Sequence, residues 1–173
     1  MDNFNEDMLA ANTKEAIDIL GRKWQYKCMS CAIANGELEL PGGLIYEDEY
    51  ITVGADTEIP LNGFIIIAVK RHVNSIADLT VTERHELIDY ISKIIQALKE
   101  LNIINEVTIV QEERSKHLHV WIFPCYKKYK KMFGKGVGAM KNICEYVKLN
   151  STSENVKQCL NTVQKLKEYF KEI

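Results

Sequence analysis

The stretch Ser115-Lys116-His117-Leu118-His119-Val120-Trp121-Ile122-Phe123-Pro124 places two imidazoles in an apolar segment that ends at a proline. Its aliphatic and aromatic residues predict a β-strand, in which neighbouring side chains point to opposite faces. His117, His119 and Trp121 should therefore share one face. Because a buried imidazole needs partners for both ring nitrogens, the pattern favours metal ligation or phosphate chemistry, with two hydrogen-bonded core histidines as the simpler alternative.

Length and composition set the class of protein. The chain has 173 residues, 46% of them hydrophobic, which fits one compact domain with a substantial core. A net charge of -2 predicts no charge-driven binding to nucleic acid or membranes. The acidic N-terminus is unlike a secretion signal, and no apolar run approaches the roughly 20 residues of a membrane span. Five cysteines with one close pair favour a reducing, cytoplasmic location over a disulfide framework.

Hydrophobic periodicity predicts an α+β fold with an antiparallel sheet. The runs expected to form strands are 50–53, 64–69, 107–110 and 117–123. Residues 81–102 carry apolar side chains at helical spacing behind a capping-box pair, Thr80 and Glu83, and predict one long amphipathic helix. Thr13 is expected to cap a short helix that stops near Gly21. We therefore divide the chain into an N-terminal helical extension (1–27), a central domain (28–124) and a helical C-terminal tail packed on that domain (125–173).

Cys28 and Cys31 have the spacing at which two thiolates can share one tetrahedral metal ion. His72, which follows the most apolar predicted strand, and His117 are the candidates to complete the site. Two sulfurs and two nitrogens suit structural zinc. Reduced cysteines that pack as small hydrophobic side chains are one alternative. A thiol–disulfide pair is another, although the βαβ context typical of such pairs is missing.

His119 is the candidate nucleophile or acid–base group, because a neutral imidazole nitrogen can attack phosphorus near pH 7. A neighbouring carbonyl could hold its other N–H and select the tautomer. Asp56 lies between two predicted strands, where it could bind a ribose diol or could bond only to its own turn. The run Lys127–Lys135 interleaves lysines with aromatic residues and could hold a polyphosphate or a base, or form a solvated face; its role stays open.

Together these motifs resemble the histidine-triad (HIT) superfamily of nucleotidyl hydrolases and transferases, in particular its zinc-bearing bacterial members. The resemblance runs from Cys28 to Pro124. Its motifs are the cysteine pair, Ile45-Tyr46-Glu47-Asp48, Lys70-Arg71-His72 with Ala77-Asp78-Leu79-Thr80, and His117-x-His119 followed by Phe123-Pro124.

The resemblance implies a HIT-like catalytic domain over residues 28–124 and a homodimer in which sheets and long helices pair. Structural zinc would be held by Cys28, Cys31, His72 and His117. His119 would attack the α-phosphate of a bound nucleotide and form a nucleotidyl-histidine intermediate, which water or a second phosphate resolves. Asp56 matches the family carboxylate that binds ribose.

The chain also departs from the family pattern. Trp121 stands in place of the third histidine, a position where the related galactose-1-phosphate uridylyltransferases have glutamine. Arg114 replaces the serine or threonine that assists the leaving group, Ser115 follows one residue later, and Phe64 replaces a histidine common after Gly63. Arg114 could compensate by holding phosphate oxygens with two hydrogen bonds. Arg114 and Ser115 thus join His119 as candidate catalytic residues, and Trp121 joins Asp56 as a candidate nucleotide contact.

We expect a nucleotidyl hydrolase that acts on nucleoside phosphoanhydrides, such as dinucleoside polyphosphates, or on phosphoramidates. One alternative is a nucleotide-binding protein without catalysis. A second is a nucleotidyltransferase that resembles the galactose-1-phosphate uridylyltransferases, and a third is a zinc-stapled interaction module. The expected partners are a nucleotide and a second copy of the chain, without nucleic acid or membrane.

Overall fold

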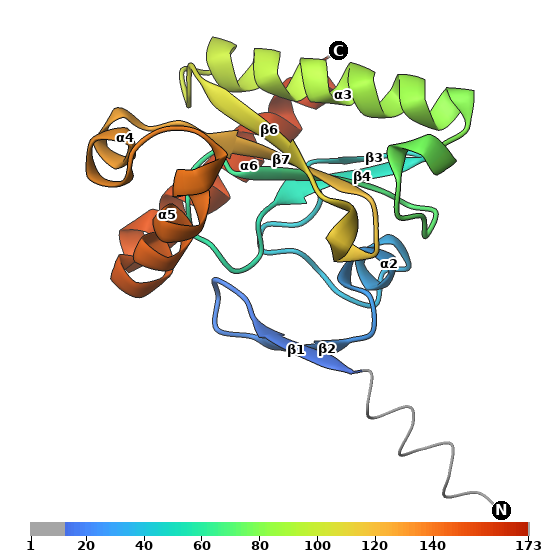
Figure 1. The fold of residues 1–173 in the computed structure, drawn as a ribbon, viewed down its shortest axis with the longest axis horizontal. Helices are drawn as coiled ribbons and strands as arrows, with labels where there is room; N and C mark the ends of the chain where they lie inside the picture. Colours follow the sequence, from blue (N-terminus) through green and yellow to red (C-terminus); the bar gives the residue numbers. More distant parts are fainter. Residues whose placement is uncertain (1–12, 173) are drawn as a thin grey trace, which may run out of the picture.

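A five-stranded antiparallel sheet forms the centre of the computed structural model, which describes residues 13–172 (Figure 1). The strand order is β3-β4-β5-β7-β6, so β4, β5 and β7 lie inside the sheet and β3 and β6 at its edges. The strands are β3 (Tyr46–Glu47), β4 (Ile51–Ala55), β5 (Ile65–Val69), β6 (Val107–Gln111) and β7 (His119–Pro124). The predicted α+β class with an antiparallel sheet is confirmed. The strand expected over 117–123 begins at His119, which leaves His117 in the preceding turn.

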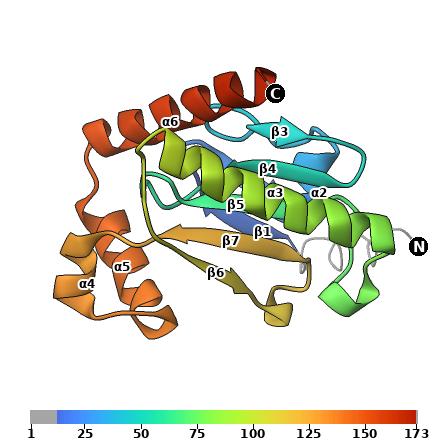
Figure 2. The ribbon, with the colours of Figure 1, turned by 90° about the horizontal axis from the view of Figure 1, so that it is seen from above.

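Two long helices, α3 (Val81–Glu100) and α6 (Ser153–Lys171), lie over one face of this sheet (Figure 2). Thr80 starts α3, because its hydroxyl accepts the Glu83 N–H and the Glu83 carboxylate accepts the Thr80 N–H. The main core is formed by aliphatic side chains of this sheet face and of the two helices. It includes Val53, Ile67, Val120, Ile94, Leu98 and Leu166.

The C-terminal tail is helical, as predicted, and longer in its helices than expected. The short helix α4 (Lys127–Phe133) and α5 (Val137–Asn150) precede α6. They pack on the sheet through a second apolar cluster, in which Phe64 and Phe123 contact residues such as Tyr129 and Ile143. This cluster fixes α5 beside one end of the sheet.

The predicted N-terminal helix is wrong for the residues that the structure describes. Residues 14–26 form a two-stranded hairpin of β1 (Lys14–Ile17) and β2 (Lys23–Tyr26). Its turn is stabilised by Asp18, whose carboxylate accepts the main-chain N–H groups of Leu20 and Arg22 and pairs with the Arg22 guanidinium. Gly21 supplies a φ of 80° in that turn. This turn chemistry outweighs the weak helical spacing. Residues 1–12 of the predicted extension lie outside the described residues.

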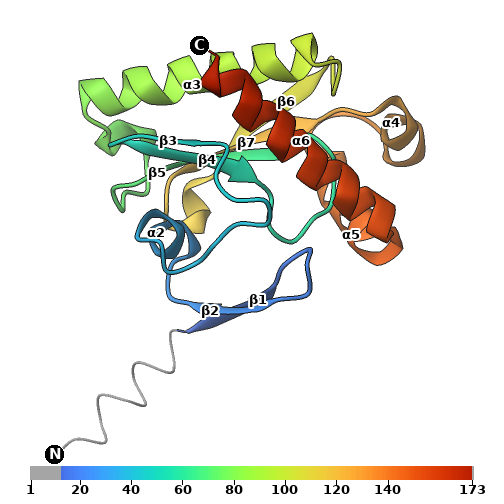
Figure 3. The ribbon, with the colours of Figure 1, turned by 180° about the vertical axis from the view of Figure 1, so that it is seen from behind.

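The hairpin and the short helix α2 (Met29–Ala34) lie on the side of the sheet opposite α3 (Figure 3). Two single-turn 3-10 helices complete the described elements, η1 (Ile76–Asp78) before α3 and η2 (Glu113–Ser115) before β7. The sheet is therefore covered by long helices on one face and faces the hairpin and α2 on the other.

Candidate functional site

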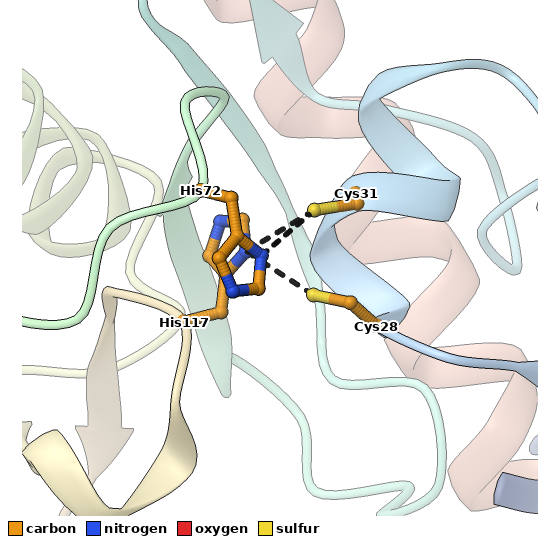
Figure 4. Close-up of side chains that lie close together, drawn as sticks. All are labelled: Cys28, Cys31, His72 and His117. Carbon is orange, nitrogen blue, oxygen red and sulfur yellow. Dashed lines mark hydrogen bonds between the residues drawn. The ribbon is translucent and has the colours of Figure 1, made fainter. Parts of the chain in front are cut away.

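Cys28, Cys31, His72 and His117 meet between α2 and the sheet (Figure 4). The start of α2 brings the two cysteines to one side, while His72 follows β5 and His117 precedes β7. The Cys28 Sγ lies 3.1 Å from His117 Nδ1, and the Cys31 Sγ lies 3.1 Å from His72 Nδ1. All four potential ligand atoms are within 4.8 Å of one another. Tetrahedral zinc with bonds of about 2.0–2.3 Å separates its ligand atoms by about 3.3–3.8 Å, so this donor set fits zinc.

The second nitrogen of His117 fixes the ring. Its Nε2–H donates to the main-chain oxygen of Val69 at 2.7 Å, so Nδ1 is the nitrogen directed at the cysteines. A carbonyl partner of this kind orients many metal-binding histidines. Burial lowers the pKa of His117, which favours the neutral form that binds metals. Burial also raises the pKa of Cys31 to about 11, with the nearby Cys28 acting in the same direction.

An ion pair braces the loop that carries His72. The Nε and Nη2 atoms of Arg71 donate to the two carboxylate oxygens of Glu83 at 2.8 and 2.7 Å. Because of this pairing, which outweighs the opposing effect of burial, the pKa of Glu83 falls to about 2. Sequence reasoning treated Glu83 only as a helix cap. No sequence signal joins the two residues, because they lie twelve positions apart, one in a loop and one in a helix.

His119 is joined to the cysteine–histidine cluster through one peptide unit. Its Nδ1 lies 2.9 Å from the main-chain oxygen of His117. A carbonyl can only accept, so Nδ1 carries the proton and Nε2 of the neutral ring carries the lone pair.

A cavity of about 760 Å³ separates the sheet from the hairpin and α2, and it brings together the remaining candidate residues. Its lining includes Asp56, Arg114, Ser115, His119 and Trp121. A smaller cavity of about 330 Å³ shares all of these residues except Asp56. His119 therefore lies where the two cavities meet.

Asp56 makes the turn bonds that were one of its two expected roles. Its Oδ1 accepts the main-chain N–H groups of Glu58 at 3.0 Å and Ile59 at 2.8 Å. These bonds occupy one carboxylate oxygen, and the residue also lines the larger cavity. Burial raises the pKa of Asp56 to about 6, despite the two N–H donors that favour the ionised form.

The other candidate residues, Arg114, Ser115 and Trp121, differ in their contacts with the rest of the protein. The exposed Arg114 pairs with Glu112 at 2.7 Å. The Ser115 hydroxyl donates to the Glu112 carbonyl at 2.8 Å, and Trp121 packs edge-on against Phe64 with ring centroids 5.4 Å apart. The basic run lies in α4 and the loop after it, and its lysines do not line either cavity.

Residues 37–128 match the HIT domain family. The chain belongs to that family. An uncharacterised HIT-like protein of Methanocaldococcus jannaschii is 29% identical over 105 residues, which are 58% of this chain and 80% of the relative. The family match begins at Glu37, so the hairpin and the cysteine pair of this HIT protein lie ahead of it.

Two solved structures show the same fold. A hypothetical histidine triad nucleotide-binding protein of Sulfolobus tokodaii has a TM-score of 0.59 at 20% identity, with coverage of 83% of this chain and 94% of that one. A zinc-bound histidine triad family protein of Mycobacterium smegmatis has a TM-score of 0.56 at 17% identity, with coverage of 82% and 96%. HIT proteins are generally nucleotide-binding hydrolases or transferases. Within residues 13–172 no helix is both long and apolar enough to cross a membrane.

Proposed function

We propose that this HIT protein is a nucleotidyl hydrolase that cleaves nucleoside phosphoanhydrides, such as dinucleoside polyphosphates, or phosphoramidates. The observation that carries the proposal is the position of His119. Its Nδ1–H bonds to the His117 carbonyl, and the residue lines both cavities. An oriented neutral imidazole beside a nucleotide-sized cavity is suited to nucleophilic attack on phosphorus.

In the proposed reaction, the Nε2 lone pair of His119 attacks the α-phosphorus. A nitrogen–phosphorus bond forms, and the bond from phosphorus to the leaving oxygen or nitrogen breaks. The leaving group keeps that electron pair and takes a proton from water. A water molecule then attacks the phosphorus, the nitrogen–phosphorus bond breaks, and the electron pair returns to Nε2. The proton of the attacking water passes to solvent, and a nucleoside monophosphate is released.

We propose roles for the other candidate residues from their positions along the two cavities. Asp56 would accept hydrogen bonds from the ribose diol. Ser115 and Arg114 would contact phosphate oxygens, which requires Arg114 to exchange its exposed pairing with Glu112 for the substrate. Trp121 stands in the place of the third family histidine and would contact the nucleotide through its ring.

Zinc would be held by Cys28, Cys31, His72 and His117. A closed site with four protein ligands supplies folding energy and rigidity rather than an open coordination position. Since the carbonyl of His117 orients His119, the cluster would act on the reaction by positioning that carbonyl.

A nucleotide-binding protein without turnover is the second candidate. Trp121 favours it, because an indole ring cannot relay a proton to a leaving group. We also propose a homodimer and a cytoplasmic location. The dimer is supported by exposed apolar residues on the edge strand β6 and on α3, and all five cysteines lie in the described part of the chain without a disulfide.

Intact-protein mass spectrometry after brief mixing with a dinucleoside polyphosphate tests the reaction. The hydrolase predicts a transient adduct with the mass of one nucleotidyl group, absent from the His119→Asn variant. Nucleoside monophosphate binding without adduct or product would support the second candidate instead.

A further inference from the structure

The hairpin β1–β2 forms one wall of the larger cavity, although it lies ahead of the part of the chain that matches the HIT domain family. Figure 3 shows it on the side of the sheet away from α3. Lys14 of β1 and Tyr26 of β2 line the cavity and are paired in the hairpin register. This HIT protein therefore closes its cavity with a segment outside the family match.

The hairpin is bonded to the loop that carries Asp56. The main-chain N–H of Ile19, in the hairpin turn, donates to the carbonyl oxygen of Thr57 at 2.8 Å. The Thr57 hydroxyl also contacts the sulfur of Met29 at 3.7 Å, at the start of α2. Thr57 is the residue next to Asp56. The hairpin is thus held at a set position relative to the proposed ribose-binding carboxylate.

The two faces of β2 differ. Lys23 and Gln25 are exposed, Trp24 is buried, and Tyr26 is half-buried at the cavity. Gln25 donates to Glu15 of β1, on the exposed face. Besides polar residues such as Lys27, Ser30 and Thr52, the lining of the cavity contains a group of apolar side chains. They include Met29, Ile33, Leu40, Ile66 and Ala68.

An aromatic ring and several apolar side chains in one cavity suit a flat, weakly polar group. Nucleobases are such groups, and they stack readily on tyrosine. Burial, with a smaller contribution from the nearby Glu58 carboxylate, raises the pKa of Tyr26, so its ring remains a neutral phenol at physiological pH. Lys14 adds an ammonium donor to the cavity lining, and Glu58, one of whose carboxylate oxygens accepts from Lys148, adds an acceptor, so both can contact the edge of a base.

We infer that the hairpin is a nucleobase clamp, in which Tyr26 stacks on the base while Asp56 holds the ribose of the same nucleotide. The inference rests on nucleotide binding in this cavity, which is part of the proposed function, but it does not require turnover. It assigns a specificity-determining role to a segment that the family match leaves out.

Calorimetric titration of the full-length protein separates base contacts from phosphate and ribose contacts. The probes are the four common nucleoside 5′-monophosphates and ribose 5-phosphate, which lacks a base. We expect Tyr26→Ala to weaken the binding of the preferred monophosphate about tenfold and to leave ribose 5-phosphate binding within twofold. Tyr26→Phe, which keeps the ring, should retain the affinity of the unmodified protein.

Gln25→Ala is the matched control, because it alters the same strand on the exposed face and should leave both affinities unchanged. Thermal unfolding and metal content of each variant report whether the hairpin and the cysteine–histidine cluster remain intact. An equal loss of affinity for the monophosphate and for ribose 5-phosphate would overturn the clamp, as would an unchanged monophosphate affinity in Tyr26→Ala. Failure of all four monophosphates to bind the unmodified protein would also overturn it. If nucleotides bind but are not hydrolysed, only the proposed hydrolase activity is contradicted, and the clamp is not.

Discussion

His119 and His117 are linked by a hydrogen bond of 2.9 Å from the Nδ1–H of the first to the main-chain oxygen of the second. His117 is itself held by its bond to Val69 and by its place beside the two cysteines. Two histidines two residues apart thus have different surroundings. His117 is 3% exposed and belongs to the cluster, whereas His119 lines the cavities.

The first prediction follows from this difference. His119→Asn should lower turnover on the order of a thousandfold or more, because it removes the nitrogen that forms the covalent intermediate. Nucleotide affinity and metal content should change little. Steady-state kinetics with the substrate that gives the adduct measure the effect, and His85→Asn, on the exposed side of α3, is the control. Full turnover by the His119 variant would exclude the covalent mechanism.

The second prediction concerns the cysteine–histidine cluster. Cys28→Ser should remove bound zinc and lower the free energy of unfolding by about 3 kcal/mol or more, since a structural metal contributes directly to folding. Elemental analysis and chemical denaturation measure the two effects. Cys125→Ser should keep the metal, because Cys125 instead contacts Thr108 in the sheet. Purified protein that contains no zinc under metal-replete expression would contradict the assignment.

The predictable and unpredictable parts of the fold differ in the range of the interactions that determine them. The helix of α3 could be predicted because Thr80 and Glu83 lie three residues apart and its apolar side chains repeat at helical spacing. The helix predicted between Thr13 and Gly21 is wrong, because this segment belongs to a hairpin that depends on the turn bonds of Asp18 and on a bond to Thr57, about forty residues away. Helical spacing over so short a segment is a weak signal.

The candidate site divides in the same way. The cysteine–histidine set could be predicted from the sequence, because the spacing of the cysteine pair and the family resemblance both indicate it. The sequence could not show that Tyr26 and Lys14 line the cavity, because only the tertiary fold brings the hairpin under the sheet. The Arg71–Glu83 brace likewise joins a loop to a helix and has no local sequence pattern.

The third prediction concerns Asp56, whose pKa is raised from 3.8 to about 6 chiefly by burial. A raised carboxyl pKa means that the folded state binds this proton more tightly, so the group costs stability as pH rises from about 4 through 6. Asp56→Asn should therefore stabilise the protein at pH 7, by about 1–2 kcal/mol after allowance for partial exposure. Near pH 4 the variant and the unmodified protein should have the same free energy of unfolding.

The same Asp56→Asn change should weaken nucleotide binding about tenfold, because it removes the charged acceptor proposed for the ribose diol. Denaturation at pH 7 and pH 4 and calorimetric titration at pH 7 measure both effects. Asp89→Asn, on the exposed face of α3, controls for the loss of a surface charge. If Asp56→Asn binds nucleotide as tightly as the unmodified protein, the ribose assignment is wrong.

The fourth prediction concerns Glu83, whose pKa is lowered to about 2 chiefly by its bonds to Arg71. A lowered carboxyl pKa contributes stability above the unfolded value of 4.5, and this contribution is lost as pH falls from 4.5 towards 2. Glu83→Gln should lower the free energy of unfolding at pH 7 by about 2 kcal/mol, a value reduced for the exposure of Arg71.

The stability difference between Glu83→Gln and the unmodified protein should shrink as the pH approaches 2. Because the pair braces the loop that carries His72, zinc affinity should also fall. Denaturation at several pH values and competition with a zinc chelator measure these effects. Glu86→Gln, one turn further along α3, is the control. An equal, pH-independent effect of both variants would contradict the role of the brace.

The fifth prediction is the homodimer. Within the described residues the edge strand β6 exposes Ile109 to 51% and has an unpaired edge, and α3 exposes Ile88 to 62%, so a second copy could cover two apolar side chains and an open strand edge. Light scattering at micromolar concentration should give twice the chain mass of 19.9 kDa. Ile109→Lys and Ile88→Lys should shift the mass towards the monomer, because a buried lysine at the interface carries a large desolvation cost. Leu149→Lys, at a site on α5 exposed to 83%, should leave the dimer intact. A monomer mass for the unmodified protein, or dissociation by Leu149→Lys alone, would show that these surfaces do not pair.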